Sequence, residues 1–198
     1  VHTAVIICLA GGILITVFGI LFSHNILALM NTKDELIDGA VLYLRIYLLG
    51  MPALGLYNFG NAVLSAAGDT KRPLYYLAFA GVVNVILNLF FVIVCHLGVA
   101  GVALASMISQ FISAFLILRA LLTGKEKYCL RLSEIRLDKR KAVGILQIGI
   151  PSAFQYLLFA FANLFVQSSV NSFDHILVEG NSAAANADPL VYLSLIHI

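Results

Sequence analysis

The chain has 198 residues, of which 61% are apolar and 11% charged, and its formal net charge is +2. With a mean hydropathy of +0.99, it has too few polar residues to cover a water-facing globular surface. These values nearly exclude soluble enzymes, nucleic-acid-binding proteins and zinc domains, and we predict an all-α polytopic membrane protein.

Five apolar segments are long enough to cross a bilayer, which takes about 20 residues. They are residues 3–30, 40–67, 74–95, 99–122 and 143–172, and a further segment begins near Leu190. Because the chain starts without a methionine and stops inside this last segment, we expect it to be part of a longer protein.

Basic residues alternate between the two sides of the predicted membrane. The gap at 31–39 holds one, 68–73 holds two, 96–98 none, 119–142 eight, and the tail beyond 173 none. By the positive-inside rule, 68–73 and 119–142 are cytoplasmic. The first span therefore runs from the inside to the outside.

Two prolines fall within spans, Pro52 in the second and Pro151 in the fifth. Each removes a backbone hydrogen bond and predicts a kink. Such kinks are either hinges of a transporter or simply tolerated, since proline is frequent in membrane helices.

The fourth span repeats a small residue every four positions. This pattern predicts a close-packing face against a neighbouring helix, formed by Gly101, Ala105, Ser109 and Ser113.

The long basic segment after the fourth span is amphipathic. We expect it to lie on the cytoplasmic leaflet, held partly by anionic lipid, or to link two bundles. Its apolar residues are Leu130, Leu132, Ile135 and Leu137. No fold that would present the basic residues to a nucleic acid is visible.

The predicted spans contain no Asp or Glu, but they do contain amides on helix faces. Buried amides need hydrogen-bond partners, so they are either interhelical bonds, the reading that spacing alone favours, or the lining of a polar cavity. The residues are Asn58, Asn61 and Ser65 in the second span, Asn84 and Asn88 in the third, Ser106, Ser109 and Gln110 in the fourth, and Gln155, Asn163, Gln167 and Asn171 in the fifth.

Arg45 is the one charge well inside a span. Its side chain either reaches the outer interface or lines a water-filled vestibule.

Metal and catalytic chemistry find no support in the residue spacing. Cys8, Cys95 and Cys129 are far apart, which argues against a disulfide or a zinc site. The five histidines lie at span ends or in loops, so a membrane-embedded enzyme is not expected.

Three motifs resemble the multidrug and toxic compound extrusion (MATE) transporters. Residues 64–73 read LSAAGDTKRP, residues 84–88 read NVILN, and residues 98–106 read GVAGVALAS. The similarity extends to about residue 193. It implies a twelve-helix protein built of two six-helix lobes.

The resemblance also implies how the chain is divided. Residues 1–122 would be the last four helices of the first lobe, 123–142 the cytoplasmic linker between the lobes, and 143–198 the first helix of the second lobe with the start of the next.

In the family, the first lobe carries a cation site. It is built from an Asp on helix one, polar residues on helix four, an Asn and an Asp on helix five, and a Thr on helix six. The matching positions here are Asn58, Asn61, Asn84, Asn88 and Ser106. Because Asn88 stands where many members have Asp, the site has one charge fewer and position 88 cannot carry a proton. Neutral oxygens can still bind Na⁺ weakly.

A Glu on helix seven, used by one branch of the family, is absent from residues 152–172, where Gln155 is the nearest polar candidate for contacting substrate. Asn163 and Gln167 follow further along the same helix, as further positions that could line a cavity or vestibule.

The function implied is secondary active efflux of amphipathic or cationic compounds, by antiport with H⁺ or Na⁺ and alternating access. No cofactor is implied, and the partners are the lipid bilayer and the transported molecules, with the full-length protein monomeric in a bacterial inner membrane. One alternative is a lipid-linked oligosaccharide flippase, although such cavities usually hold several basic residues and these spans offer only Arg45. The other is a truncated fragment without activity.

Overall fold

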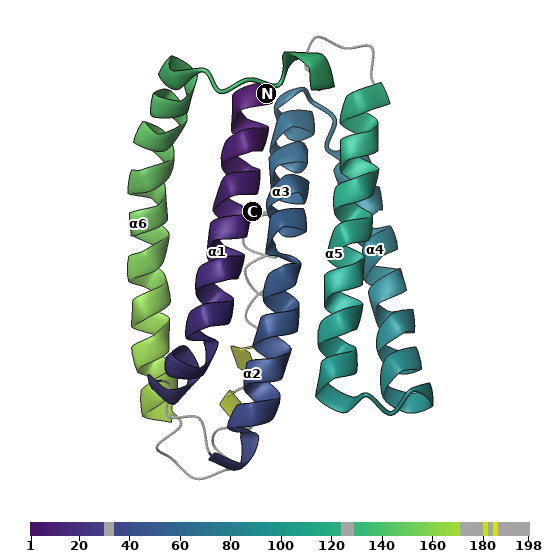
Figure 1. Cartoon of the computed structure of the whole chain (residues 1–198), viewed down its shortest axis with the longest axis vertical. Helices are drawn as coiled ribbons and strands as arrows, with labels where there is room; N and C mark the ends of the chain where they lie inside the picture. Colours follow the sequence, from purple (N-terminus) through teal and green to yellow (C-terminus); the bar gives the residue numbers. More distant parts are fainter. Residues whose placement is uncertain (30–33, 124–128, 171–179, 182–183, 186–198) are drawn as a thin grey trace. The chain divides into compact units, whose positions relative to one another are not determined.

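The computed structural model describes residues 1–29, 34–123, 129–170, 180–181 and 184–185, and within these ranges it contains helices and no strand (Figure 1). The chain divides into two compact units, Val1–Ile145 and Leu146–Ile198. The helices are α1 (His2–Leu29), α2 (Asp34–Leu49), α3 (Met51–Ala66), α4 (Lys71–Leu89) with the π-helical turn η1 (Phe90–Val94), α5 (Gly98–Thr123), the 3₁₀ turn η2 (Leu132–Glu134) and α6 (Lys139–Val170).

The predicted spans correspond to these helices. Among the described residues, four helices are long and apolar enough to cross a bilayer alone: His2–Leu29, Lys71–Val94, Gly98–Thr123 and Lys139–Val166. The second predicted span is a pair, α2 and α3, bent by 45° where they meet. The all-helical membrane fold is thereby confirmed, with four helices of spanning length in the described residues, or five if the bent α2–α3 pair counts as one span. The segment near Leu190 lies outside the described residues.

Helices α2, α4 and α6 begin several residues before the predicted spans, and at α4 and α6 an aspartate accepts hydrogen bonds from backbone N–H groups of the first turn. Asp69 Oδ1 accepts a hydrogen bond from the backbone N–H of Arg72 at 3.2 Å, at the start of α4. Asp138 Oδ1 accepts from the N–H groups of Arg140 at 3.0 Å and Lys141 at 3.3 Å, at the start of α6. Such caps satisfy backbone donors of the first helical turn, and these helices extend into charged sequence that hydropathy alone would leave outside.

Within the first unit, α1 packs along both α2 and α3, and α5 packs against α2, α3 and α4 (Figure 1). The α4–α5 pair forms an antiparallel hairpin. The small-residue face of α5 is buried as predicted, at Gly101, Ala105, Ser109 and Ser113.

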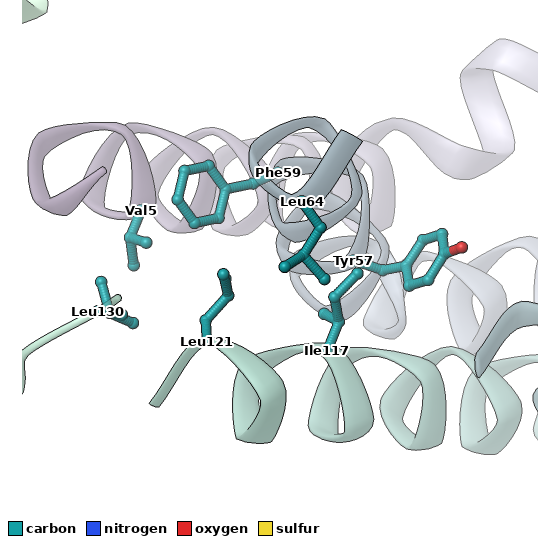
Figure 2. Packing of buried hydrophobic residues seen from close by; sticks show 7 residues of the cluster. All are labelled: Val5, Tyr57, Phe59, Leu64, Ile117, Leu121 and Leu130. Carbon is teal, nitrogen blue, oxygen red and sulfur yellow. The ribbon is translucent and has the colours of Figure 1, made fainter. Parts of the chain in front are cut away.

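A hydrophobic cluster closes one end of this unit. Figure 2 shows side chains from α1, α3, α5 and the segment after α5 turned toward one another. Leu64, Ile117 and Leu121 are fully buried. The cluster consists of Val5, Tyr57, Phe59, Leu64, Ile117, Leu121 and Leu130.

Residues 129–138, which we call the strap, turn two of their apolar side chains toward this cluster. Leu130 is 4% exposed and Ile135 packs beside it, whereas Leu137 stays exposed. That this segment lies on the cytoplasmic leaflet stays a prediction, but two of its four apolar residues, Leu130 and Ile135, pack on the bundle. The physical reason is a backbone hydrogen bond of 3.0 Å from the N–H of Leu130 to the carbonyl of Leu121, which brings Leu130 onto the bundle.

The strap is also hydrogen-bonded to the first turn of α1. Thr3 Oγ1 donates to the carbonyl of Arg136 at 3.2 Å and accepts from the N–H of Asp138 at 3.3 Å. His2 Nε2 accepts from the N–H of Arg131 at 3.0 Å. These bonds satisfy backbone groups of a segment that has almost no regular structure of its own.

In the second unit, α6 continues as one helix through Pro151. Its spanning window contains no buried residue. Such an apolar helix fits lipid or further membrane helices.

Candidate functional site

Polar side chains of α4 and α5 form one hydrogen-bonded chain between the two helices. Asn88 Nδ2 donates to Asn84 Oδ1 at 3.0 Å, and Asn84 Nδ2 donates to Ser109 Oγ at 3.1 Å. Ser109 Oγ in turn donates to the carbonyl of Ser106 at 2.9 Å. The i, i+4 spacing of the two asparagines on α4 puts them on one face, and Ser109 meets them from the buried small-residue face of α5.

This chain leaves one strong acceptor without a donor. Asn88 Oδ1 is buried and has no hydrogen-bond partner among the described residues. Its own NH₂ is already used on Asn84. A buried carbonyl oxygen without a donor is unfavourable, so the site fits a cation or another hydrogen-bond donor.

The predicted residues on α3 belong to separate surroundings. Asn61 Oδ1 accepts from Ser65 Oγ at 3.2 Å, within the same helix. Asn58 is exposed and lines a hollow of about 350 Å³ between α1 and α3, beside Gly12, Met51 and other mostly apolar residues. The hydrogen bonds of the described residues thus join Asn84 and Asn88 to α5 but do not include Asn58 or Asn61, and Ser106 takes part through its backbone carbonyl.

A side chain of α1 donates a hydrogen bond at the break between α2 and α3. Pro52 has no N–H, so the Leu48 carbonyl lacks its usual donor four residues later. Thr16 Oγ1 of α1 donates to that carbonyl at 2.6 Å. A hydroxyl from a neighbouring helix thus replaces the missing backbone donor, which is how membrane proteins tolerate such breaks.

Close packing at the same break depends on two glycines. A Cβ on Gly12 of α1 would lie 2.7 Å from Pro52 Cα, and a Cβ on Gly50 would overlap Gln110 Oε1 of α5. Gln110 Oε1 is the second buried oxygen without a partner among the described residues. One turn of α5, from Ser106 to Gln110, therefore makes two contacts. Its Ser109 meets α4, and its Gln110 meets the break between α2 and α3.

Arg45 is exposed on α2, and its Nε donates to Ser23 Oγ of α1 at 2.9 Å. Ser23 is fully buried. Two neighbouring rings, Tyr43 and Tyr47, stack with centroids 6.0 Å apart. One nitrogen of the guanidinium is thus hydrogen-bonded to α1. Whether the side chain reaches the outer interface or lines a water-filled vestibule stays a prediction.

The candidates on α6 lie in the second unit. Gln155 and Asn163 are exposed there, and the side chain of Gln167 lies outside the described residues. Their part in a cavity stays a prediction.

No group of three or more His, Cys, Asp or Glu side chains that could hold a metal ion occurs in the part of the chain that the structure describes. A cation at the α4–α5 site would be held by neutral oxygens, as hard cations allow.

Sequence reasoning missed two roles. Ser109 was predicted as a packing residue and a polar group of the fourth span but not as a partner of Asn84, and Thr16 was not singled out at all. For Ser109 the signal was available, because it is a hydroxyl in a small-residue stripe facing a helix that carries amides. Thr16 could have been sought as the donor that a proline in the next span requires.

Three kinds of comparison agree on what the chain resembles. A family model described as MatE matches residues 1–90. The probable multidrug resistance proteins YpnP and YoeA of Bacillus subtilis are 33% and 31% identical to it, over 88% and 82% of this chain and 39% and 36% of theirs. A crystal structure of MATE in the bent conformation has a TM-score of 0.79 at 24% identity, covering 94% of this chain and 42% of that one. The chain thus spans less than half the length of these relatives.

Proposed function

The chain belongs to the MATE family of multidrug transporters, and on this premise we propose that the complete protein exports amphipathic or cationic compounds by antiport with Na⁺ or H⁺. Export would proceed by alternating access of the two lobes. Residues 1–122 would supply four helices of the first lobe, residues 123–142 the linker and residues 143–198 the start of the second. The lipid bilayer and small organic molecules are its partners in this proposal.

One observation carries the proposal, the buried oxygen of Asn88 that lacks a donor. Polar groups are costly in a membrane interior, and when they stay unsatisfied by protein they mark ion and substrate paths. A small cation bound there would complete the coordination of Asn88 and draw on the neighbouring amide of Asn84. Because neither amide titrates, the residues of this pair favour Na⁺ over H⁺ as the ion that they bind.

The proposal assigns sidedness as well. Loops 68–73 and 119–142 would be cytoplasmic, in the inner membrane of a bacterium. The positions of two basic residues support this. Arg72 lies at the start of α4 and Lys141 at the start of α6, and each forms an ion pair with an aspartate.

The test is export of a fluorescent organic cation from cells that express the complete protein. Asn84→Ala removes both the acceptor for Asn88 and the donor to Ser109, and we expect it to lower export strongly at equal expression. Asn25→Ala, the same change at an exposed position near the end of α1, is the matched control. Export by Asn84→Ala at the level of the control would refute the site.

A further inference from the structure

Three hydrogen bonds run in one direction, from Asn88 to Asn84, from Asn84 to Ser109 and from Ser109 to the Ser106 carbonyl, and the second of them joins α4 to α5. In the structure the Ser109 hydroxyl donates its single proton to the carbonyl of Ser106, which can only accept, across 2.9 Å. Ser109 Oγ is then left to act only as an acceptor. It faces the amide of Asn84 at 3.1 Å.

The orientation of both asparagines follows from this hydroxyl. Asn84 has to turn its NH₂ toward Ser109, and its oxygen therefore faces Asn88. Asn88 can meet that oxygen only with its own NH₂, which lies 3.0 Å away. The oxygen of Asn88 is thereby left over, buried and without a partner among the described residues.

We propose that Ser109 is a positioning residue that gives the Asn84–Asn88 site the polarity of an acceptor, so that the site takes a small cation and rejects anions. Ser109 acts two hydrogen bonds away from the oxygen that would meet the cation. Its role is to prevent the amide of Asn84 from reversing, which would let Asn88 reverse and present NH₂ to the site. The inference rests on the proposed function, because it concerns the ion that would drive export.

The same helix face offers a matched control. Ser113 lies one turn further along α5, is buried to a similar degree, at 5% exposed against 8% for Ser109, and donates to a carbonyl of its own helix, that of Gln110, at 2.9 Å. No asparagine of α4 is bonded to Ser113 in the described structure. Replacing either serine removes one buried hydroxyl, but only at position 109 does this release the amide chain.

The experiment measures Na⁺ binding by titration calorimetry of the purified complete protein. We expect Ser109→Ala to weaken Na⁺ binding about tenfold, the change that follows from loss of one net hydrogen bond. Ser113→Ala should stay within about twofold of the wild type. Ser109→Thr keeps the hydroxyl and should restore binding, with Ser113→Thr reporting the effect of an added methyl group on this face.

Each result decides the question. Equal affinities of the Ser109→Ala and Ser113→Ala proteins, or failure of Ser109→Thr to restore binding while Ser113→Thr is tolerated, would overturn the role of Ser109 and leave the proposed export untouched. A wild type that binds no Na⁺ would overturn the acceptor polarity together with Na⁺ coupling, while gradient-driven export could still be measured separately. If Ser109→Ala fails to fold, Ser109→Cys keeps the volume with weaker hydrogen bonds, and its binding should also be reduced.

Discussion

Replacing Thr16 by Val tests how the bent span is held. The change keeps the shape of the side chain and removes the hydroxyl that donates to the Leu48 carbonyl at 2.6 Å. Because Pro52 has no N–H, the usual backbone donor four residues later cannot take its place. An unsatisfied buried acceptor costs about 1–3 kcal/mol in soluble proteins, whereas interhelical hydrogen bonds in membranes average about 0.6 kcal/mol. We therefore expect Thr16→Val to lower the free energy of unfolding by about 1 kcal/mol. Thr16→Ser, which keeps the hydroxyl, should recover most of this loss.

A double-mutant cycle separates this bond from general packing. Pro52→Ala supplies an N–H at position 52 that can reach the Leu48 carbonyl if the helix straightens, so Thr16→Val should then cost less. The expected coupling energy is about 1 kcal/mol, measured by reversible unfolding of the complete protein in detergent. An equal cost of Thr16→Val in the wild-type protein and in the Pro52→Ala protein would refute Thr16 as the partner of that carbonyl.

Two further predictions concern packing around the first unit. Gly12→Ala places a Cβ 2.7 Å from Pro52 Cα, so the backbone has to move. We expect the free energy of unfolding to fall by about 1–3 kcal/mol, measured by thermal melting. Gly11→Ala, whose Cβ meets nothing within 4 Å, should be neutral in the same experiment. Leu130→Ala should cost about 2–3 kcal/mol and speed proteolysis within the strap, because Leu130 is 4% exposed in the cluster. Leu137→Ala, at a position 57% exposed, is its control, and equal proteolysis of the two would contradict the inward turn of the strap.

The spans could be predicted from sequence because charge and apolar length are local properties. Their ends could not, since Asp69 and Asp138 accept hydrogen bonds from backbone N–H groups in the first turns of α4 and α6, which hydropathy does not register. The position of the break was signalled by Pro52, but the helix that supplies the missing donor depends on packing between spans.

The candidate site was predictable only in part, for the same reason. The spacing of Asn84 and Asn88 places them on one face of a helix, and this is a local property. That Ser109 rather than Asn58 or Asn61 contacts them depends on which faces of α3, α4 and α5 meet. In the strap, alternation of charge with leucine predicted an interfacial face, while a single backbone bond to α5 turns Leu130 inward.

Ion-coupled export is the central claim, and reconstitution tests it most directly. The complete protein in liposomes would be given an imposed Na⁺ gradient or pH gradient, and accumulation of a fluorescent organic cation would be followed in each. The account predicts accumulation that requires a gradient, stops when an ionophore collapses it, and falls sharply in the Asn84→Ala protein. Accumulation at the same rate without any gradient, or none under either gradient, would contradict it.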